Sequence, residues 1–287
     1  MSIDIDIVSC ISERFNALRD AEKKVAKLVM DDLDSCANAS ITQLAERAGV
    51  SEATITRFAK AVGCKNVRDL KIKLAQSLAV GQRFIYEPVD NSGAQGIYES
   101  IKQSMDLNRK LLNEDDIRTA VEWLHNARQI IAIGMGGGST MIAQEFQNRV
   151  FRLGYAVTSY CDGLQVRMVA STADANDVIL IMSVTGYTPT IVETAELAKH
   201  YGVKVIAITV VDSPLAELSD LVLPITTKET DFIYKPSASR YAMLAMVDVL
   251  AMELAVSHKR RSRDRLRRLK LALDAHRGGI DRQPLGD

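Results

Sequence analysis

Apolar residues recur at helical spacing through the first eighty residues of the chain. Between Ile7 and Asp32 they fall at Ile11, Phe15, Leu18, Val25, Leu28 and Val29, at intervals that fit one or two helical turns or an adjacent position on the same face. A further helix is predicted to begin at Asn66, where leucines at 70, 74 and 78 share one side. No strand-like alternation interrupts this region. We therefore predict an all-α domain over residues 1–80.

The segment 41–60, ITQLAERAGVSEATITRFAK, predicts two short helices joined by a tight turn. Gly49 can adopt the left-handed conformation that a sharp turn requires, and Ser51 can cap the second helix through its hydroxyl. Small and apolar side chains fall on one face of each helix, at Leu44, Ala45 and Ala48 and then at Ile55 and Phe58. These features together describe a helix-turn-helix, whose second helix lies in the DNA major groove.

The early residues of such a second helix meet base edges. The candidates for base contacts here are Glu52, Ala53, Thr54, Thr56 and Arg57. Arg57 suits either a bidentate contact with guanine or a phosphate, and Glu52 suits either cytosine or a favourable charge at a helix N-terminus. The candidates for phosphate contacts are Ser51, Lys60, Lys65 and Lys71. Double-stranded DNA is therefore the predicted partner.

The hydrophobic pattern changes at Gln129, where short apolar runs begin to alternate with amphipathic helices. The runs lie at 130–134, 155–160, 178–183, 203–209 and 221–225. Continuous apolar strands separated by helices predict a five-stranded parallel sheet covered on both faces. Residues 81–96, which contain Pro88 and three glycines, are predicted to be a linker, so the α/β domain spans 97–287.

Two loops of this sheet have the composition of an anion site. The first, GMGGGST at 134–140, offers glycine backbone at Gly136 and a hydroxyl at Ser139 ahead of a helix. A Rossmann dinucleotide loop fits poorly, because Ser139 replaces its third glycine and only Asp162 follows the second strand. The second loop, SVTGYTPT at 183–190, carries hydroxyls around one glycine, at Ser183, Thr185, Gly186 and Thr188.

The pieces IGMGGGS, IMSVTGYTPTIVE and AITVVDSPLAELSDLVLPI resemble a sugar isomerase (SIS) domain, a flavodoxin-like phosphosugar-binding fold. With the helix-turn-helix ahead of it, the chain resembles the RpiR family of bacterial transcription regulators. This resemblance implies a sugar-phosphate or phosphorylated sugar-acid effector and a homodimer or homotetramer on a palindromic operator. It also implies that Ser139, Ser183, Thr185 and Thr188 bind the phosphate, and that the stretch from Ser237 to Arg240 faces the sugar.

Composition narrows the function further. Lys plus Arg equals Asp plus Glu at 36 each, but residues 47–80 carry seven basic residues against two acids, which suits a phosphate backbone. Four scattered cysteines predict neither disulfides nor a metal site, and no cofactor is expected. Without a signal peptide or a long apolar run, we predict a soluble cytoplasmic protein.

Catalysis is not expected, because aldose–ketose isomerisation needs a positioned base. None of the four histidines falls in either loop, and Glu145 and Glu193, which follow the loops, suit solvated or ligand-hydroxyl contacts. We therefore predict a regulator of carbohydrate genes that acts as a repressor; a phosphosugar isomerase with an accessory helical domain is the alternative. Residues 259–270, KRRSRDRLRRLK, carry eight basic residues and one acid and predict an exposed helix, with DNA or a partner subunit as further contacts.

Overall fold

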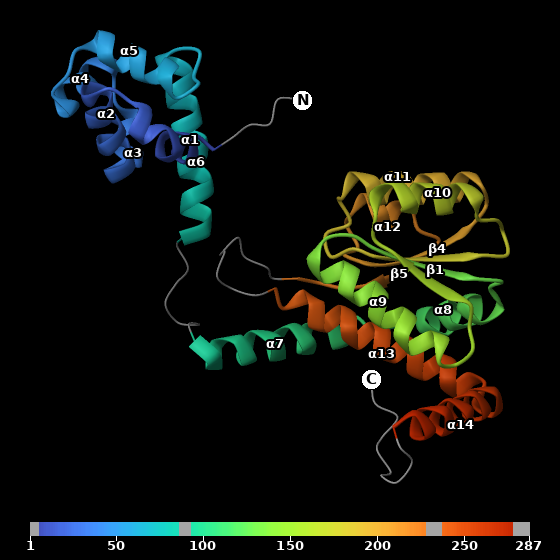
Figure 1. Cartoon of the computed structure of the whole chain (residues 1–287). Coiled ribbons are helices and arrows are strands. Elements are labelled where there is room, and N and C mark those ends of the chain that lie inside the picture. Colours follow the sequence, from blue (N-terminus) through green and yellow to red (C-terminus); the bar gives the residue numbers. More distant parts are fainter. Residues whose placement is uncertain (1–5, 86–92, 228–236, 278–287) are drawn as a thin grey trace. The chain divides into compact units, whose positions relative to one another are not determined.

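The computed structural model of the chain describes residues 6–85, 93–227 and 237–277 (Figure 1). The described residues up to Ile85 form one compact unit, and those from Gly93 onward form a second. Helix continues to Ile85 and begins again at Gly93, so it enters both ends of the segment 81–96 that was predicted as a linker. Within these ranges no single helix is both long and apolar enough to span a membrane.

The first unit is entirely helical. Its elements are α1 (Ile7–Arg14), the short 3-10 helix η1 (Phe15–Ala17), α2 (Asp20–Asp31), α3 (Leu33–Asn38), α4 (Ile41–Ala48), α5 (Glu52–Ala61) and α6 (Val67–Ile85). The helical pattern between Ile7 and Asp32 is broken at Arg19, whose backbone is extended. There the Glu22 carboxylate accepts a hydrogen bond from the Arg19 N–H at 3.0 Å and starts a new helix. Fully buried Phe58 and Leu74 lie in the core.

The second unit is an α/β domain. Its helices are α7 (Gly93–Arg109), α8 (Glu114–Asn126), α9 (Gly137–Phe151), α10 (Gly163–Thr172), α11 (Pro189–His200), α12 (Pro214–Leu218), α13 (Ser239–Ser257) and α14 (Lys259–His276). Its strands are β1 (Ile130–Gly134), β2 (Val157–Tyr160), β3 (Val178–Met182), β4 (Lys204–Thr209) and β5 (Leu221–Pro224). The strands pair in parallel in the order β2-β1-β3-β4-β5, which confirms the predicted sheet.

Each central strand is buried on both faces, as its continuous apolar sequence predicts. Ile130 and Ala132 of β1 face the side covered by α8, α9 and α13, whereas Ile131 and Ile133 face α10, α11 and α12 (Figure 1). The register pairs Ile131 with Ile179 of β3, so the two faces continue across the sheet. This arrangement fixes which loops emerge together at each end of the strands.

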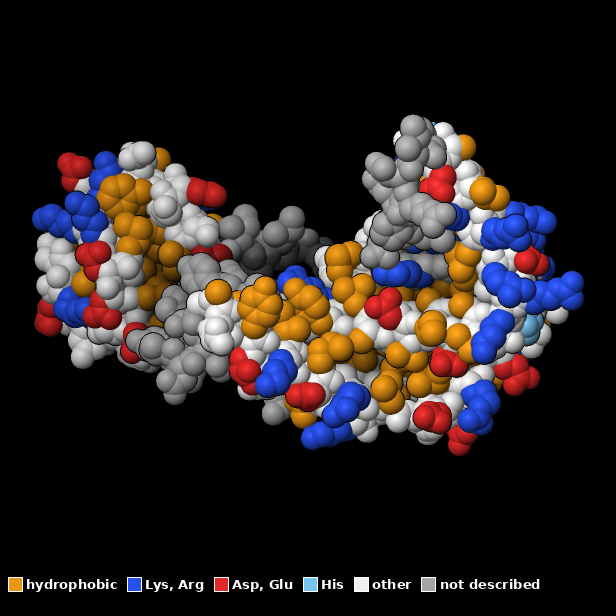
Figure 2. Space-filling model, turned by 90° about the horizontal axis from the view of Figure 1, so that it is seen from below, with side chains coloured by type: hydrophobic (Ala, Val, Ile, Leu, Met, Phe, Trp, Pro, Cys, Tyr) orange, Lys and Arg blue, Asp and Glu red, His pale blue; other side chains and the backbone are white. Residues whose placement is uncertain are grey.

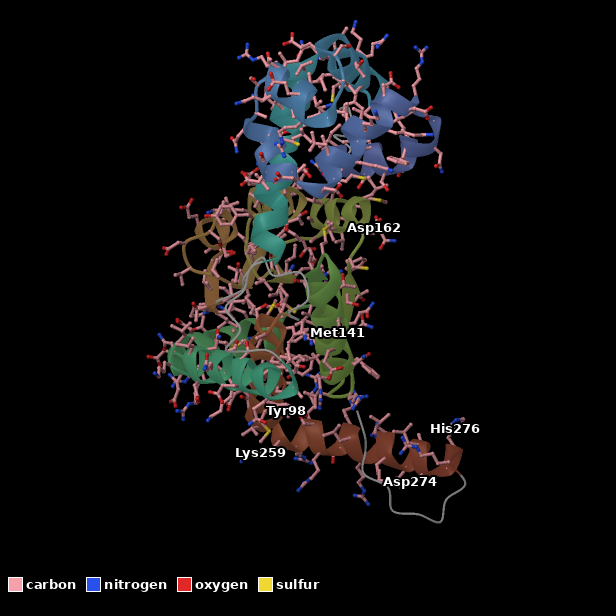
Figure 3. All side chains as sticks on the ribbon, turned by 90° about the vertical axis from the view of Figure 1, so that its left-hand side faces the viewer. Tyr98, Met141, Asp162, Lys259, Asp274 and His276 are labelled. Atoms are coloured by element: carbon pink, nitrogen blue, oxygen red, sulfur yellow. The ribbon has the colours of Figure 1, made fainter. Side chains whose placement is uncertain are left out.

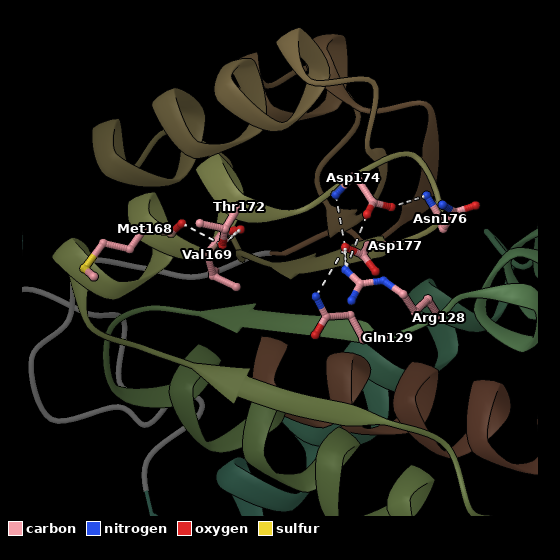
Figure 4. Close-up of polar contacts among 8 residues, drawn as sticks. All are labelled: Arg128, Gln129, Met168, Val169, Thr172, Asp174, Asn176 and Asp177. Atoms are coloured by element: carbon pink, nitrogen blue, oxygen red, sulfur yellow. Dashed lines mark hydrogen bonds and ion pairs between the residues drawn. The ribbon is translucent and has the colours of Figure 1, made fainter.

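The amino ends of β1 and β3 are joined by a buried carboxylate (Figure 4). One oxygen of Asp177, which is fully buried, accepts hydrogen bonds from Arg128 Nη2 at 2.6 Å, Gln129 Nε2 at 3.2 Å and the Asp174 N–H at 3.0 Å. Burial raises the pKa of Asp177, but these hydrogen bonds lower it further, and its pKa lies below the ordinary value of 3.8. The ionised form is therefore the one that the fold stabilises.

At the other edge of the domain, α14 leaves α13 at an angle of 108°. His258, at the break, stacks on His125 of α8 with ring centroids 3.3 Å apart, and His125 Nδ1 lies 2.9 Å from the Tyr155 hydroxyl. Arg261 lies over the Tyr155 ring at 4.7 Å and donates a hydrogen bond to the Gly154 carbonyl at 2.9 Å. Burial, His258 and Arg261 lower the pKa of His125, which favours its neutral form.

We predict that Asp177→Asn lowers the free energy of unfolding at pH 7 by about 2 kcal/mol, since charged hydrogen bonds are lost in a buried position. Because the folded-state pKa is depressed, the stability from this carboxylate is present above pH 3.8 and is lost as the pH falls through the folded value. The gap between wild type and variant should therefore narrow in acid.

Urea unfolding at several pH values measures this gap. Asp115→Asn is the matched control, because the Asp115 side chain is 82% exposed and its pair with Arg118 should contribute little. If Asp177→Asn lowers the free energy of unfolding at pH 7 by no more than Asp115→Asn does, the stabilising role of the Asp177 carboxylate is contradicted.

Candidate DNA-contacting and effector-binding sites

The helix-turn-helix is formed by α4 and α5. A capping box of Ser40 and Gln43 starts α4, and Gly49 ends it in the left-handed conformation with φ 62°. The Ser51 hydroxyl then accepts a hydrogen bond from the Thr54 N–H at 3.3 Å and caps α5. The turn therefore has the geometry that Gly49 and Ser51 predict, and it fixes the start of the recognition helix α5.

The predicted DNA-contacting side chains differ in their access to solvent. Most lie on the surface of the unit, either exposed (Ser51, Glu52, Arg57, Lys60 and Lys65) or partly exposed (Thr56 and Lys71). Thr54, in contrast, is only 4% exposed. Its hydroxyl lies 3.0 Å from the Ser51 hydroxyl and accepts a hydrogen bond from Arg57 Nη2 at 3.0 Å. The prediction that Thr54 meets a base edge is corrected, because its buried hydroxyl instead holds Arg57.

Glu52 has a further contact that the sequence pattern did not suggest. The Thr42 hydroxyl donates a hydrogen bond to Glu52 Oε1 at 2.6 Å and so ties the start of α5 to α4. Arg47 is also engaged, because it pairs with Asp32 at 2.8 Å and donates to the Ser35 hydroxyl. Arg57, in contrast, is exposed and, among the described residues, has no such pairing with another helix. One nitrogen of its guanidinium donates to the Thr54 hydroxyl on the same helix.

In the second unit, the two predicted ligand loops leave neighbouring strands. β1 pairs with β3, while the chain leaves β1 toward β2 on the other side. Ligands of open parallel sheets bind at such a switch point, beyond the carboxyl ends of the strands. The loop after β1 is Met135-Gly136 and leads into α9, and the loop after β3 spans 183–188 and leads into α11.

Close packing shapes the loop after β1. A Cβ on Gly134 would lie 2.0 Å from the Ser139 carbonyl oxygen, so that position admits glycine alone. Gly136 has φ 84° and exposes the first turn of α9. Ser139 lies on that turn and is 8% exposed, while the Thr140 hydroxyl donates to the Gly134 carbonyl at 3.2 Å. The helix N-terminus is thus open to an anion.

The loop after β3 folds around its own hydroxyls. Ser183 Oγ accepts from the Gly186 N–H at 3.2 Å, and Thr185 Oγ1 accepts from the Tyr187 N–H at 3.4 Å. Ser183 is buried and Thr185 is exposed. Thr188 is the N-cap residue of α11, yet its side chain makes no capping hydrogen bond. Among the residues that the structure describes, its half-buried hydroxyl has no hydrogen-bond partner, so it is available to a ligand at this helix N-terminus.

Residues at and after the end of β4 pack against this loop, a contact that the sequence pattern did not predict. Gly186 has φ 71°, and a Cβ there would lie 2.2 Å from Ser213 Oγ and 2.7 Å from Thr209 Oγ1. The Ser213 hydroxyl caps α12 and donates to the Val210 carbonyl at 2.8 Å. Thr209 is fully buried, and its hydroxyl has no hydrogen-bond partner within the described ranges.

Arg240, on the first turn of α13, belongs to the same end of the sheet. Its Cβ lies 3.9 Å from the position that a Cβ on Gly138 would take, so it stands beside the start of α9. The guanidinium lies 5.1 Å from the Tyr241 ring centroid and donates to the Tyr241 hydroxyl at 3.4 Å. Ser237 is exposed, with its hydroxyl 2.7 Å from that of Ser239. The structure therefore brings Arg240 beside the start of α9, and its predicted contact with a sugar stays a prediction.

Comparisons with known proteins agree with both halves. A model of the helix-turn-helix domain of the rpiR family matches residues 5–81, and a model of the SIS domain matches residues 123–253. The chain belongs to the rpiR family. HTH-type transcriptional regulators named HexR are 36% identical in Pseudomonas aeruginosa, over 96% of this chain and 98% of the relative, and 32% identical in Escherichia coli, over 98% of each.

The fold of this rpiR-family regulator also occurs in a solved structure of the Vibrio vulnificus NanR protein complexed with ManNAc-6P. That structure has a TM-score of 0.59 at 24% identity and covers 93% of this chain and 98% of its own. The chain is therefore a DNA-binding transcriptional regulator that carries an SIS domain.

Both glutamates that follow the ligand loops of this regulator are engaged in ion pairs. Glu145 accepts from Arg149 Nε at 2.6 Å, and Glu193 pairs with Arg167 at 2.9 Å. Of the histidines, His125 lies against Tyr155 and His258, and His200 ends α11 at the far end of that helix. Each of these four side chains thus lies in an ion pair or away from the two loops.

We predict that Arg57→Ala weakens binding to DNA selected by the protein from a random duplex pool by about 1–3 kcal/mol, because a base contact is lost. Thr54→Val, which removes the hydroxyl that holds Arg57, should weaken the same binding by less. Fluorescence anisotropy at fixed salt measures both variants.

Lys60→Gln serves as the comparison, since losing a phosphate contact should weaken binding to all sequences alike and reduce the salt slope by about one. If Arg57→Ala instead weakens binding to all sequences alike and reduces the salt slope, as expected for Lys60→Gln, Arg57 contacts the phosphate backbone and not a base.

Gly186→Ala should destabilise the loop after β3 by more than Gly202→Ala does at the end of α11. Both glycines have positive φ, of 71° and 73°, but only Gly186 would bring its new methyl against neighbouring atoms. The conformational cost of about 1–2 kcal/mol is common to both variants, so their difference isolates the clash with Ser213 and Thr209. Thermal unfolding of the two variants gives this difference, and equal melting temperatures would contradict the packing argument.

Proposed function

We propose that this protein represses genes of carbohydrate or central carbon metabolism and that a sugar phosphate or phosphorylated sugar acid controls it. The observation that carries the proposal is the free Thr188 hydroxyl at the N-terminus of α11, next to the open start of α9 on the adjoining strand. Hydroxyls and backbone donors at helix N-termini bind phosphate without a basic side chain. Arg240 adds a cation at the edge of the same site.

The relatives support this proposal. NanR is complexed with a phosphorylated amino sugar, and its fold is the fold of this chain. The relatives named HexR are transcriptional regulators, and two ion pairs occupy the glutamates that an isomerase could use as bases. We infer that the protein binds its effector without turnover, and that it acts in the cytoplasm as a homodimer or homotetramer on operator DNA.

Control of DNA binding follows from linkage. If the effector lowers operator affinity 100-fold, operator binding must lower effector affinity by the same factor, a coupling of about 3 kcal/mol. The effector must therefore bind one arrangement of the protein better than the other. In this scheme, occupied loops at β1 and β3 disfavour the arrangement that grips DNA, and genes are expressed when the sugar phosphate accumulates.

We expect a hexose phosphate, amino-sugar phosphate or phosphorylated sugar acid to raise the melting temperature of wild type in a thermal-shift panel, since a ligand at 100 times its Kd stabilises the folded state by about 2.7 kcal/mol. The matching unphosphorylated sugars should not. Thr188→Ala should remove most of the shift, because it deletes the free hydroxyl, and should also remove the effect of that compound on DNA binding.

Thr172→Ala is the matched control, because Thr172 is exposed on α10 and its hydroxyl bonds to its own helix at Met168 and Val169 (Figure 4). An equal response of both variants to the effector would remove Thr188 from the site. Turnover of the bound compound in a coupled isomerase assay, at ordinary enzyme rates, would replace the regulator model with the isomerase alternative.

A further inference from the structure

Helix α14 carries a stripe of cations along one face. Lys259, Arg263, Arg267 and Lys270 are spaced by four, four and three residues, which places them one above another on a helix. The stripe is about 16 Å long at 1.5 Å per residue. Figure 3 shows α14 running from Lys259 to His276, with side chains pointing away from the ribbon into solvent.

The stripe borders a groove between α13 and α14. The angle of 108° between the two helices opens a space of about 880 Å³. Ala255 and Val256 of α13 and Leu266 of α14 form its apolar part, and the four cations of the stripe line it together with Arg260. Figure 2 shows Lys and Arg side chains gathered on the right-hand side of the view. We call this feature the basic groove.

The cations of α14 divide into two groups. On the opposite face, Arg261 bonds to the Gly154 carbonyl, and Arg265 Nε lies 3.1 Å from the position of a Cβ on Gly154, so both attach the helix to the domain. In contrast, Lys259, Arg263 and Arg267 have no ion pair with any described residue, and Lys270 shares the carboxylate of Asp274 on its own helix. The fold therefore uses one face of the helix, and on the other face three of the four cations have no ion pair among the described residues.

This arrangement does not favour the helix itself. Like charges at a spacing of four destabilise a helix by about 0.2–0.5 kcal/mol per pair, and Lys259–Arg263 and Arg263–Arg267 are two such pairs. A polyanion that lies along the groove would neutralise these charges.

We propose that the basic groove binds the phosphate backbone of double-stranded DNA as a contact separate from α5. DNA carries a phosphate roughly every 1.7 Å of its axis, so a stripe of this length can meet several of them. The proposal rests on DNA being the partner of this chain, but not on the effector or on a particular operator. Net charge is zero over the whole chain, so this local excess supplies an attraction that the overall charge does not.

The test compares Arg263→Gln/Arg267→Gln with Lys102→Gln/Lys110→Gln. All four residues are exposed, and both double variants change the net charge equally. The probe is a labelled 40-bp duplex of arbitrary sequence, titrated by anisotropy between 50 and 200 mM KCl. Each lost phosphate contact should reduce the slope of log K against log salt by about 0.9. We expect the α14 variant to lose close to two such contacts and at least tenfold in affinity near 0.1 M salt, and the control variant to keep the wild-type slope.

Equal slopes for the two double variants would overturn the proposal, as would a wild type that does not bind this duplex. If the α14 variant instead lowers the mass measured by sedimentation and leaves the slope unchanged, the groove is a contact between copies of the chain and the proposal fails. Unchanged circular dichroism would show that the fold is intact. Failure of the proposed function gives a different result. In that case Arg57→Ala would not reduce discrimination between selected and arbitrary DNA, whatever the salt slopes of the α14 variant show.

Discussion

The parallel pairing of β1 with β3 is the interaction on which the proposed effector site depends, because it brings the loops that lead into α9 and α11 to neighbouring strand ends. Both strands are buried on both faces, and they pair in register from Ile130 with Val178 to Gly134 with Met182. Asp177 fixes the amino ends of these strands, and the glycine and hydroxyl loops follow at their carboxyl ends. The sheet therefore holds both loops at the same end of the domain.

The support of the second loop by β4 extends this constraint. Gly186 lies against Ser213 and Thr209 with no space for a methyl group, so the loop after β3 and the start of α12 must move together. Packed interiors change between discrete arrangements rather than deforming gradually. A phosphate bound to the Thr188 hydroxyl would thus affect the carboxyl ends of β1, β3 and β4, which are neighbours in the sheet. This is a physical route from a small ligand to a larger conformational change.

Sequence reasoning predicted the elements whose local signals agree with one another. Gly49 and Ser51 specify the turn between α4 and α5, and uninterrupted apolar runs specify the buried strands. It did not predict that Thr54 is buried, because periodicity gives the faces of a helix but not the depth to which each is covered. Nor could it place Arg240 beside Gly138 by pattern alone, since their proximity depends on how α13 packs against α9. The family resemblance implied only that the stretch from Ser237 to Arg240 faces a sugar.

The same limit applies to charge. A count of Lys and Arg treats all the cations of α14 alike. Arg261 and Arg265 nevertheless hold the helix in place, whereas Arg263 and Arg267 form no ion pair within the described part of the chain. In α5, likewise, Arg57 is exposed but restrained by Thr54. A restrained cation loses less conformational entropy on binding and suits discrimination between bases, whereas a stripe of free cations suits the phosphate backbone. Specificity and electrostatic affinity can therefore reside in different units of one chain, so that an effector acting on the SIS domain could weaken the second without altering the surface that provides the first.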